Sequence, residues 1–158
     1  MEKAKVYFTK ELTPQGLLRL FDQVQAKLEG KVAVKLHSGE VGNQNFIRPP
    51  FFRELIQKVN GTIVECNTAY EGKRNTTKDH WETMKLHGWC DIAEVDIMDE
   101  DGEFALPIEN GHQIKENYVG AHLKEYDSML VLSHFKGHPM GGFGGALKNI
   151  SIGIASAH

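Results

Sequence analysis

Three segments carry apolar residues at the spacing of one helix face, which predicts three helices. Each segment is followed by a glycine or an Asn-Gly pair, a common way for a helix to end. The first should begin after Thr13, a good N-cap, with Pro14 at the first helical position. Thr76 with Asp79 three residues later resembles a capping box at the start of the third. The helices are expected at residues 14–29, 49–59 and 76–87.

Other segments alternate apolar with polar residues or form short apolar runs, which is typical of strands. Asp101-Gly102 lies between two alternating stretches, residues 95–97 and 104–108, and predicts a hairpin that a polar strand near residues 113–118 extends. Short helices are expected at residues 119–126 and 146–152. The remaining strands are expected at residues 5–8, 31–37, 62–66 and 129–132.

This alternation of strands and helices predicts a three-layer, Rossmann-like α/β sandwich with a mainly parallel sheet and a small β-hairpin insertion. Residues 1–158 are expected to form a single α/β domain. Ligands of such sheets bind at the carboxyl ends of the strands. Three polar or glycine-rich loops leave strands there and should converge: residues 38–48, 67–75 and 134–148.

The third loop has the densest candidate chemistry. His138 is the preferred general base or metal ligand, His134 lies four residues earlier, and Lys148 would supply a cation. Glycine amides can bind anions at such a loop, and those expected to contribute are Gly141, Gly142, Gly144 and Gly145. The alternative is a tight turn that packs a helix against the sheet, with solvated histidines.

The first two loops add directional polar groups. His37, Asn43 and Arg48 lie in or beside the first, and Lys73 and Arg74 lie in the second. Arginine offers a fork that fits a carboxylate or phosphate, so these residues are candidate ligand-binding groups. The alternative is that both loops are ordinary solvated turns.

Composition narrows the functional classes. The chain has 158 residues and a net charge of −3, which gives no electrostatic reason to expect nucleic acid or an anionic membrane as partner. No apolar run is long enough to span a membrane. Two cysteines are too few for a four-thiolate iron–sulfur cluster.

The N-terminus does not have the pattern of a signal peptide, so we expect a cytoplasmic location. The apolar, uncharged residues 151–158 suggest that the chain continues in a longer protein.

Several segments resemble the bacterial domain of unknown function found in uncharacterised iron–sulfur centre proteins. The resemblance covers essentially the whole chain and implies that it corresponds to the N-terminal half of that architecture. Cluster ligands would then lie beyond this chain. The segments that carry it are Lys35–Asn43, Asn45–Pro49, and Leu132–His138 through Gly153–Ser156.

A more distant likeness is to the N-terminal domain of nickel-pincer lactate racemases. His138 and Lys148 are spaced like a histidine and the lysine that holds the cofactor there, and Arg48-Pro49 resembles an Arg-Pro pair. Lys73 stands where those racemases have an acid/base histidine, and their nickel-ligating histidine would fall beyond His158. The likeness therefore implies the shared loops and a small anionic ligand, whereas these two departures weaken the case for the nickel cofactor and for racemase activity without excluding them.

We expect an enzyme-like domain that binds a small anionic metabolite or cofactor, linked to iron–sulfur or redox chemistry in the longer family protein. The alternative is a non-catalytic binding or electron-transfer module that docks a redox partner or the missing C-terminal half. A third interpretation is a folded fragment whose glycines pack against absent residues.

Overall fold

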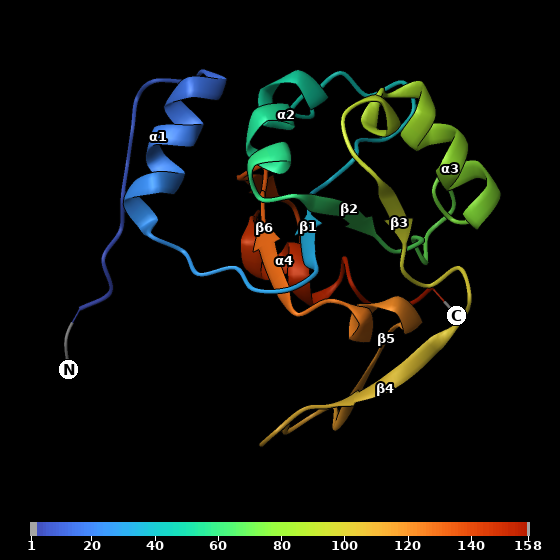
Figure 1. Ribbon diagram of the computed structural model, residues 1–158. Helices are drawn as coiled ribbons and strands as arrows, with labels where there is room; N and C mark the ends of the chain where they lie inside the picture. The colour runs from blue at the N-terminus through green and yellow to red at the C-terminus, as the bar shows by residue number, and fades with distance from the viewer. Residues whose placement is uncertain (1–2, 158) are drawn as a thin grey trace.

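The fold is built on a four-stranded parallel sheet (Figure 1). The computed structural model describes residues 3–157, so both ends of the expected domain, residues 1–2 and 158, lie outside the described residues. The strand order is β3-β2-β1-β6, with parallel pairing throughout. The strands are β1 (Val32–Lys35), β2 (Gly61–Glu65), β3 (Val95–Ile97) and β6 (Ser128–Val131).

Three helices cover one face of this sheet: α1 (Pro14–Val24), α2 (Pro49–Lys58) and α3 (Thr77–Leu86). The main core lies between them and the strands, where Val34 and Ile63 pack with Leu55, Met84 and Trp89. All five side chains are at most 1% exposed. Burial of such apolar surface is the dominant favourable term in folding.

A smaller core lies on the opposite face, where Ala33, Val64, Cys66 and Met98 pack together. The 3-10 helix η2 (Ala121–Glu125) and the C-terminal segment around Ile154 cover it. Two more short helices complete the set: η1 (Trp89–Asp91) follows α3, and α4 (Ala146–Ser151) follows the glycine-rich segment. Because both faces are covered, all four residues of β1 are buried, which matches the expected α/β sandwich.

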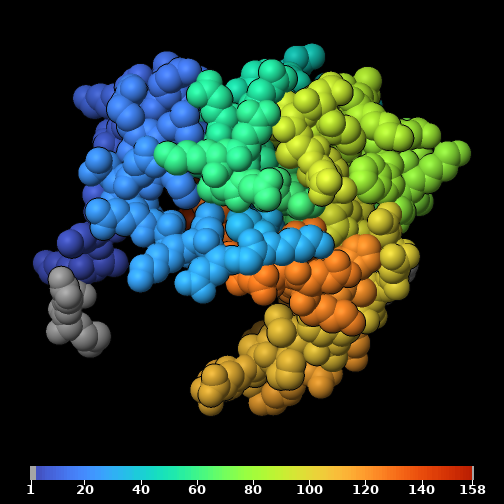
Figure 2. Space-filling model, viewed as in Figure 1, coloured from blue at the N-terminus to red at the C-terminus, as the bar shows by residue number. Residues whose placement is uncertain are grey.

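Two antiparallel hairpins lie outside the four-stranded parallel sheet. The first pairs β4 (Glu103–Pro107) with β5 (Glu116–Gly120) and projects from the body of the molecule (Figures 1 and 2). The second pairs β7 (Lys136–His138) with β8 (Gly142–Gly144) inside the glycine-rich segment. Gly142, with φ 73°, supplies the left-handed residue directly after the turn of this second hairpin.

The expected strand at residues 5–8 is wrong. These residues form no strand, and Val6 and Phe8 are 88% and 81% exposed. A strand needs a neighbour to pair with, and the sheet's order gives this segment none. The first helix also ends at Val24, earlier than expected, because Gln25 adopts a left-handed conformation with φ 51°.

The expected hairpin at Asp101-Gly102 is wrong in its pairing. β3 pairs in parallel with β2, while β4 pairs with β5, the polar strand that had been expected only to extend it. The helix expected at residues 119–126 is a shorter 3-10 turn, η2. Within residues 3–157, no helix has the length and apolar character that crossing a membrane requires.

Candidate functional site

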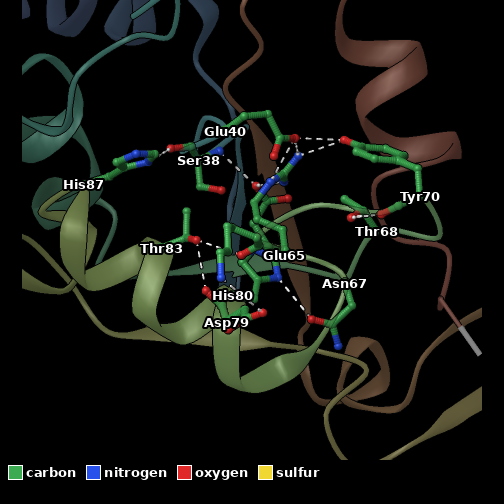
Figure 3. A network of polar contacts seen from close by, with 12 residues as sticks. Ser38, Glu40, Glu65, Asn67, Thr68, Tyr70, Asp79, His80, Thr83 and His87 are labelled. Carbon is green, nitrogen blue, oxygen red and sulfur yellow. Dashed lines mark hydrogen bonds and ion pairs between the residues drawn. The ribbon is translucent and has the colours of Figure 1, made fainter. Parts of the chain in front are cut away.

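A cavity of about 490 Å³ lies at the carboxyl ends of the central strands. All three expected loops contribute to its wall. Cys66, Ala69, Ile152 and Ala155 contribute apolar surface to a wall that also carries many polar side chains. Figure 3 shows part of its polar network, with Glu40 and Tyr70 pointing toward each other. The sheet therefore presents its loops in the arrangement that binds ligands in other open α/β folds.

A buried ion pair forms the floor of the cavity. Lys35 ends β1 and Glu65 ends β2, and their side chains are 1% and 3% exposed. Lys35 Nζ lies 2.6 Å from Glu65 Oε2, and it also donates to the Leu36 carbonyl at 2.7 Å and Asn149 Oδ1 at 2.9 Å. The ammonium thus has three acceptors, which a buried charge needs to offset its lost hydration.

The backbone at Gly153 packs closely against this floor. A Cβ at Gly153 would lie 3.0 Å from Lys35 Nζ and 2.4 Å from the Asn149 carbonyl oxygen. A larger residue at position 153 would therefore displace the chain that covers the lysine.

Arg74 joins the second loop to the first. Its Nη1 lies 3.4 Å from Glu65 Oε1, and its Nε donates to Glu40 Oε1 at 3.1 Å. Its Nη2 contacts Glu40 and donates to the Tyr70 hydroxyl at 3.1 Å, while that hydroxyl donates to Glu40 at 2.9 Å. The Arg74 side chain is 4% exposed, so its charge is compensated by groups within the protein.

These contacts set the ionisation of the two acids. Burial opposes ionisation of Glu65, but Lys35 and Arg74 outweigh it and hold the pKa of that carboxyl well below its usual range. Glu40 follows the same pattern, since the Arg74 guanidinium lowers its pKa despite partial burial. Burial opposes the charge of Arg74 too, but Glu65 and Glu40 raise its pKa. The network therefore holds two carboxylates and two cations in balance at neutral pH.

Backbone contacts hold the first loop above this floor. Ser38 N donates to Glu65 Oε1 at 2.9 Å. The Ser38 carbonyl accepts from Trp89 Nε1 at 2.9 Å and lies 2.9 Å from His87 Nδ1 (Figure 3). Glu65, at the end of β2, thus positions the first loop. The side chains of His87 and Trp89, which follow α3 in the chain, support the same loop.

Three histidines line the cavity: His37, His134 and His138. Burial lowers the pKa of His37, which favours a neutral ring at pH 7. His134 Nδ1 is buried and has no hydrogen-bond partner within residues 3–157. His138 Nδ1 accepts from the backbone N–H groups of Met140 at 3.3 Å and Gly141 at 3.1 Å.

Two lysines of the glycine-rich segment complete the polar lining. Lys136 and Lys148 both border the cavity, and neither forms an ion pair with an acid within the described residues. The register of β7 with β8 sets Lys136 opposite Gly144 and His138 opposite Gly142. Since residues two apart share a face of a strand, Lys136 and His138 lie on one face of the hairpin.

The predicted site residues divide into two groups. Most of them border the cavity: His37, Asn43, Arg74, His134, His138, Gly144, Gly145 and Lys148.

The others lie outside its wall. The guanidinium carbon of Arg48 lies 4.0 Å from the centre of the Phe46 ring, and Nη2 donates to the carbonyl and side-chain oxygens of Gln44. Lys73 is exposed and lies 3.9 Å from Asp79. Gly141 lies in the turn between β7 and β8, and Gly142 is the first residue of β8. Arg48 and Lys73 are therefore engaged elsewhere by nearby side chains.

The sequence interpretation missed the two residues at the centre of the network, Lys35 and Glu65. Each is a charged residue at the end of an otherwise apolar strand. Such residues are almost never fully buried unless they are paired. A single charge as the last residue of each of two neighbouring parallel strands is the signal that could have identified the pair.

A separate polar cluster lies outside this cavity, at Asp96, Glu100 and His122. Among the described residues, this is the group of three side chains close enough together to share a metal ion. His122 Nδ1 lies 2.7 Å from Asp96 Oδ1, and Nε2 lies 3.1 Å from Asp101 Oδ2. Hydrogen bonding to Asp96 raises the pKa of His122. Both ring nitrogens of His122 are engaged, so its hydrogen-bonding groups are satisfied by the surrounding carboxylates.

His138, the predicted metal ligand, has no comparable set of neighbours within residues 3–157.

Comparison with known proteins gives one informative result. Neither the curated proteins nor the solved structures include a match to the chain. The model of one protein family does match it, over residues 32–158, which include every strand of the sheet and all three loops around the cavity. The chain therefore belongs to the family described as Domain of unknown function (DUF362).

Proposed function

We propose that the cavity binds a small organic anion, a carboxylate or a phosphorylated metabolite, in an enzyme-like site. One observation carries this proposal, the charge balance of the lining. Glu40 and Glu65 are already compensated by Arg74 and Lys35, whereas Lys136 and Lys148 have no acidic partner within the described residues. The uncompensated charge of the cavity is thus positive, and an anion would neutralise it.

The histidines support proton transfer to or from such a ligand. A neutral imidazole near a bound carboxylate can act as an acid or base at neutral pH. Burial lowers the pKa of His37 and so favours its neutral form, and the residue borders the cavity. His37 is therefore the candidate proton acceptor, on the side of the cavity contributed by β1.

Thermal unfolding with added anions tests the binding proposal. Inorganic phosphate and a panel of small carboxylates should raise the melting temperature of the wild type, because a ligand at a hundred times its Kd adds about 2.7 kcal/mol to stability. Lys148→Gln should reduce this shift. Lys78→Gln is the matched control, since Lys78 is an exposed lysine on α3 away from the cavity. Equal shifts in the two variants would contradict the proposal.

The second candidate is a non-catalytic binding or electron-transfer module. It is favoured by exposed apolar side chains on the glycine-rich segment, where Phe135, Met140 and Phe143 are 72%, 93% and 58% exposed. Native mass spectrometry with metal analysis of the protein isolated from cells separates the candidates. A bound organic anion supports the first, and iron with sulfide supports a redox module.

A further inference from the structure

His138 is held in an unusual way for a residue on an exposed hairpin. Its Nδ1 accepts hydrogen bonds from two backbone N–H groups, those of Met140 and Gly141. A nitrogen that accepts from N–H groups carries no proton of its own, and a neutral imidazole then has its proton on the other nitrogen. The hairpin tip therefore selects the tautomer protonated at Nε2.

We propose that His138 is a tautomer-locked hydrogen-bond donor that selects for anionic ligands and against metal ions. This inference rests on the proposed anion site and assigns one of its contacts. Nε2–H has no partner within residues 3–157, and the residue borders the cavity. Nε2–H is thus available to an ionised carboxylate or phosphate oxygen, which accepts hydrogen bonds and does not donate them.

The same geometry opposes a role as a metal ligand. Ligation through Nε2 requires that nitrogen to be unprotonated, and the neutral ring then carries its proton on Nδ1. That proton would point at two N–H donors in place of an acceptor. Metal ligation would therefore cost both backbone hydrogen bonds, and a base at Nε2 would meet the same obstacle.

Nitrogen NMR tests the tautomer without any ligand. Long-range proton–nitrogen correlation spectra of labelled protein, assigned with His138→Gln, should show His138 protonated at Nε2 and bare at Nδ1. Gly141→Pro removes one amide donor and should raise the population protonated at Nδ1 by about 2- to 10-fold, the worth of one hydrogen bond. Gly141→Ala is the matched control, because it keeps the amide and its Cβ would have its nearest neighbours at 3.6 Å. A wild-type ring protonated at Nδ1, or equal spectra for the two variants, would overturn the proposal.

Calorimetric titration with inorganic phosphate and with acetate tests the donor. His138→Gln keeps an N–H donor near the position of Nε2 and should weaken binding by less than about 3-fold, whereas His138→Leu should weaken it by about 10-fold or more. Equal losses in both variants would remove the donor role. A Zn²⁺ affinity of the wild type that falls in His138→Gln would show metal ligation instead. Absence of anion binding by the wild type would contradict the proposed function, while the NMR result would still decide the tautomer.

Discussion

At the scale of single residues, the pairing of Lys35 with Glu65 is the most consequential contact. Both side chains are almost wholly buried, and each satisfies the other. Such pairs add little net stability compared with well-packed apolar residues, but removing one partner leaves an uncompensated buried charge. The pair therefore serves chiefly to place charge and backbone donors at the floor of the cavity.

Glu65→Gln should lower the free energy of unfolding by about 3–5 kcal/mol, because Lys35 and Arg74 lose the carboxylate between them. Urea denaturation measures the change. Glu71→Gln is the control, an exposed glutamate in the second loop, which should change stability by less than about 0.5 kcal/mol. Similar small changes in both variants would show that the buried pair is dispensable.

His122 should make stability depend on pH in the opposite sense to the buried acids. Its pKa is raised in the folded protein by Asp96, with smaller contributions from Asp101 and Glu125. The stabilisation is then fully present below the unfolded pKa and is lost as the pH rises through the folded one. The stability difference between wild type and His122→Gln should be larger near pH 5.5 than near pH 8.5, with the change centred above about 6.5. A difference that grows with pH would contradict this linkage.

At the scale of elements, local signals in the sequence predicted best where capping chemistry is strong. Thr13 accepts from Gly16 N at 3.0 Å and Thr76 accepts from Asp79 N at 3.2 Å, as the N-cap patterns indicated. Hairpin pairing was less predictable, because Asp101-Gly102 favours a turn without specifying which strands it joins. β3 pairs with β2 because the edge of β2 that β1 leaves free is available to it. Which edge is free depends on the assembled fold and not on the local sequence.

Thr76→Ala should lower the free energy of unfolding by about 1 kcal/mol, because the first turn of α3 loses its side-chain acceptor. Thr76→Ser keeps an oxygen in the capping position and should lose much less. Parallel thermal and urea denaturation of the two variants provides the measurement. Equal destabilisation would indicate that the threonine methyl group, and not the cap, supplies the stability.

At the scale of the whole molecule, the topology gathers the three loops, and the sequence pattern predicted that gathering. It could not predict which side chains point inward. Arg48 and Lys73 are as polar as His37 and Lys148, but Phe46 and Asp79 engage them elsewhere. Lys35 and Glu65 were missed because their contacts join positions 30 residues apart, which local spacing does not reveal.

Hydrogen exchange should be strongly uneven across the molecule. Amides of β1 and β2 lie in the buried centre of the sheet and should exchange only through global unfolding. Amides of β7 and β8 belong to an isolated two-stranded hairpin with exposed neighbours and should exchange orders of magnitude faster. Mass-spectrometric exchange at peptide resolution gives the comparison. Comparable protection of the two regions would mean that the hairpin belongs to the cooperative core.

The contact of Lys35 with Asn149 spans 114 residues, and it has a kinetic consequence. Closing so long a loop is entropically costly, so non-local contacts slow folding. β1 can meet β2 early, but the cavity floor is complete only after the segment following β6 has returned to the sheet. During refolding, helical circular dichroism should therefore recover before the capacity to bind an anion. A nascent chain would acquire its fold-stabilising core first and its chemistry last.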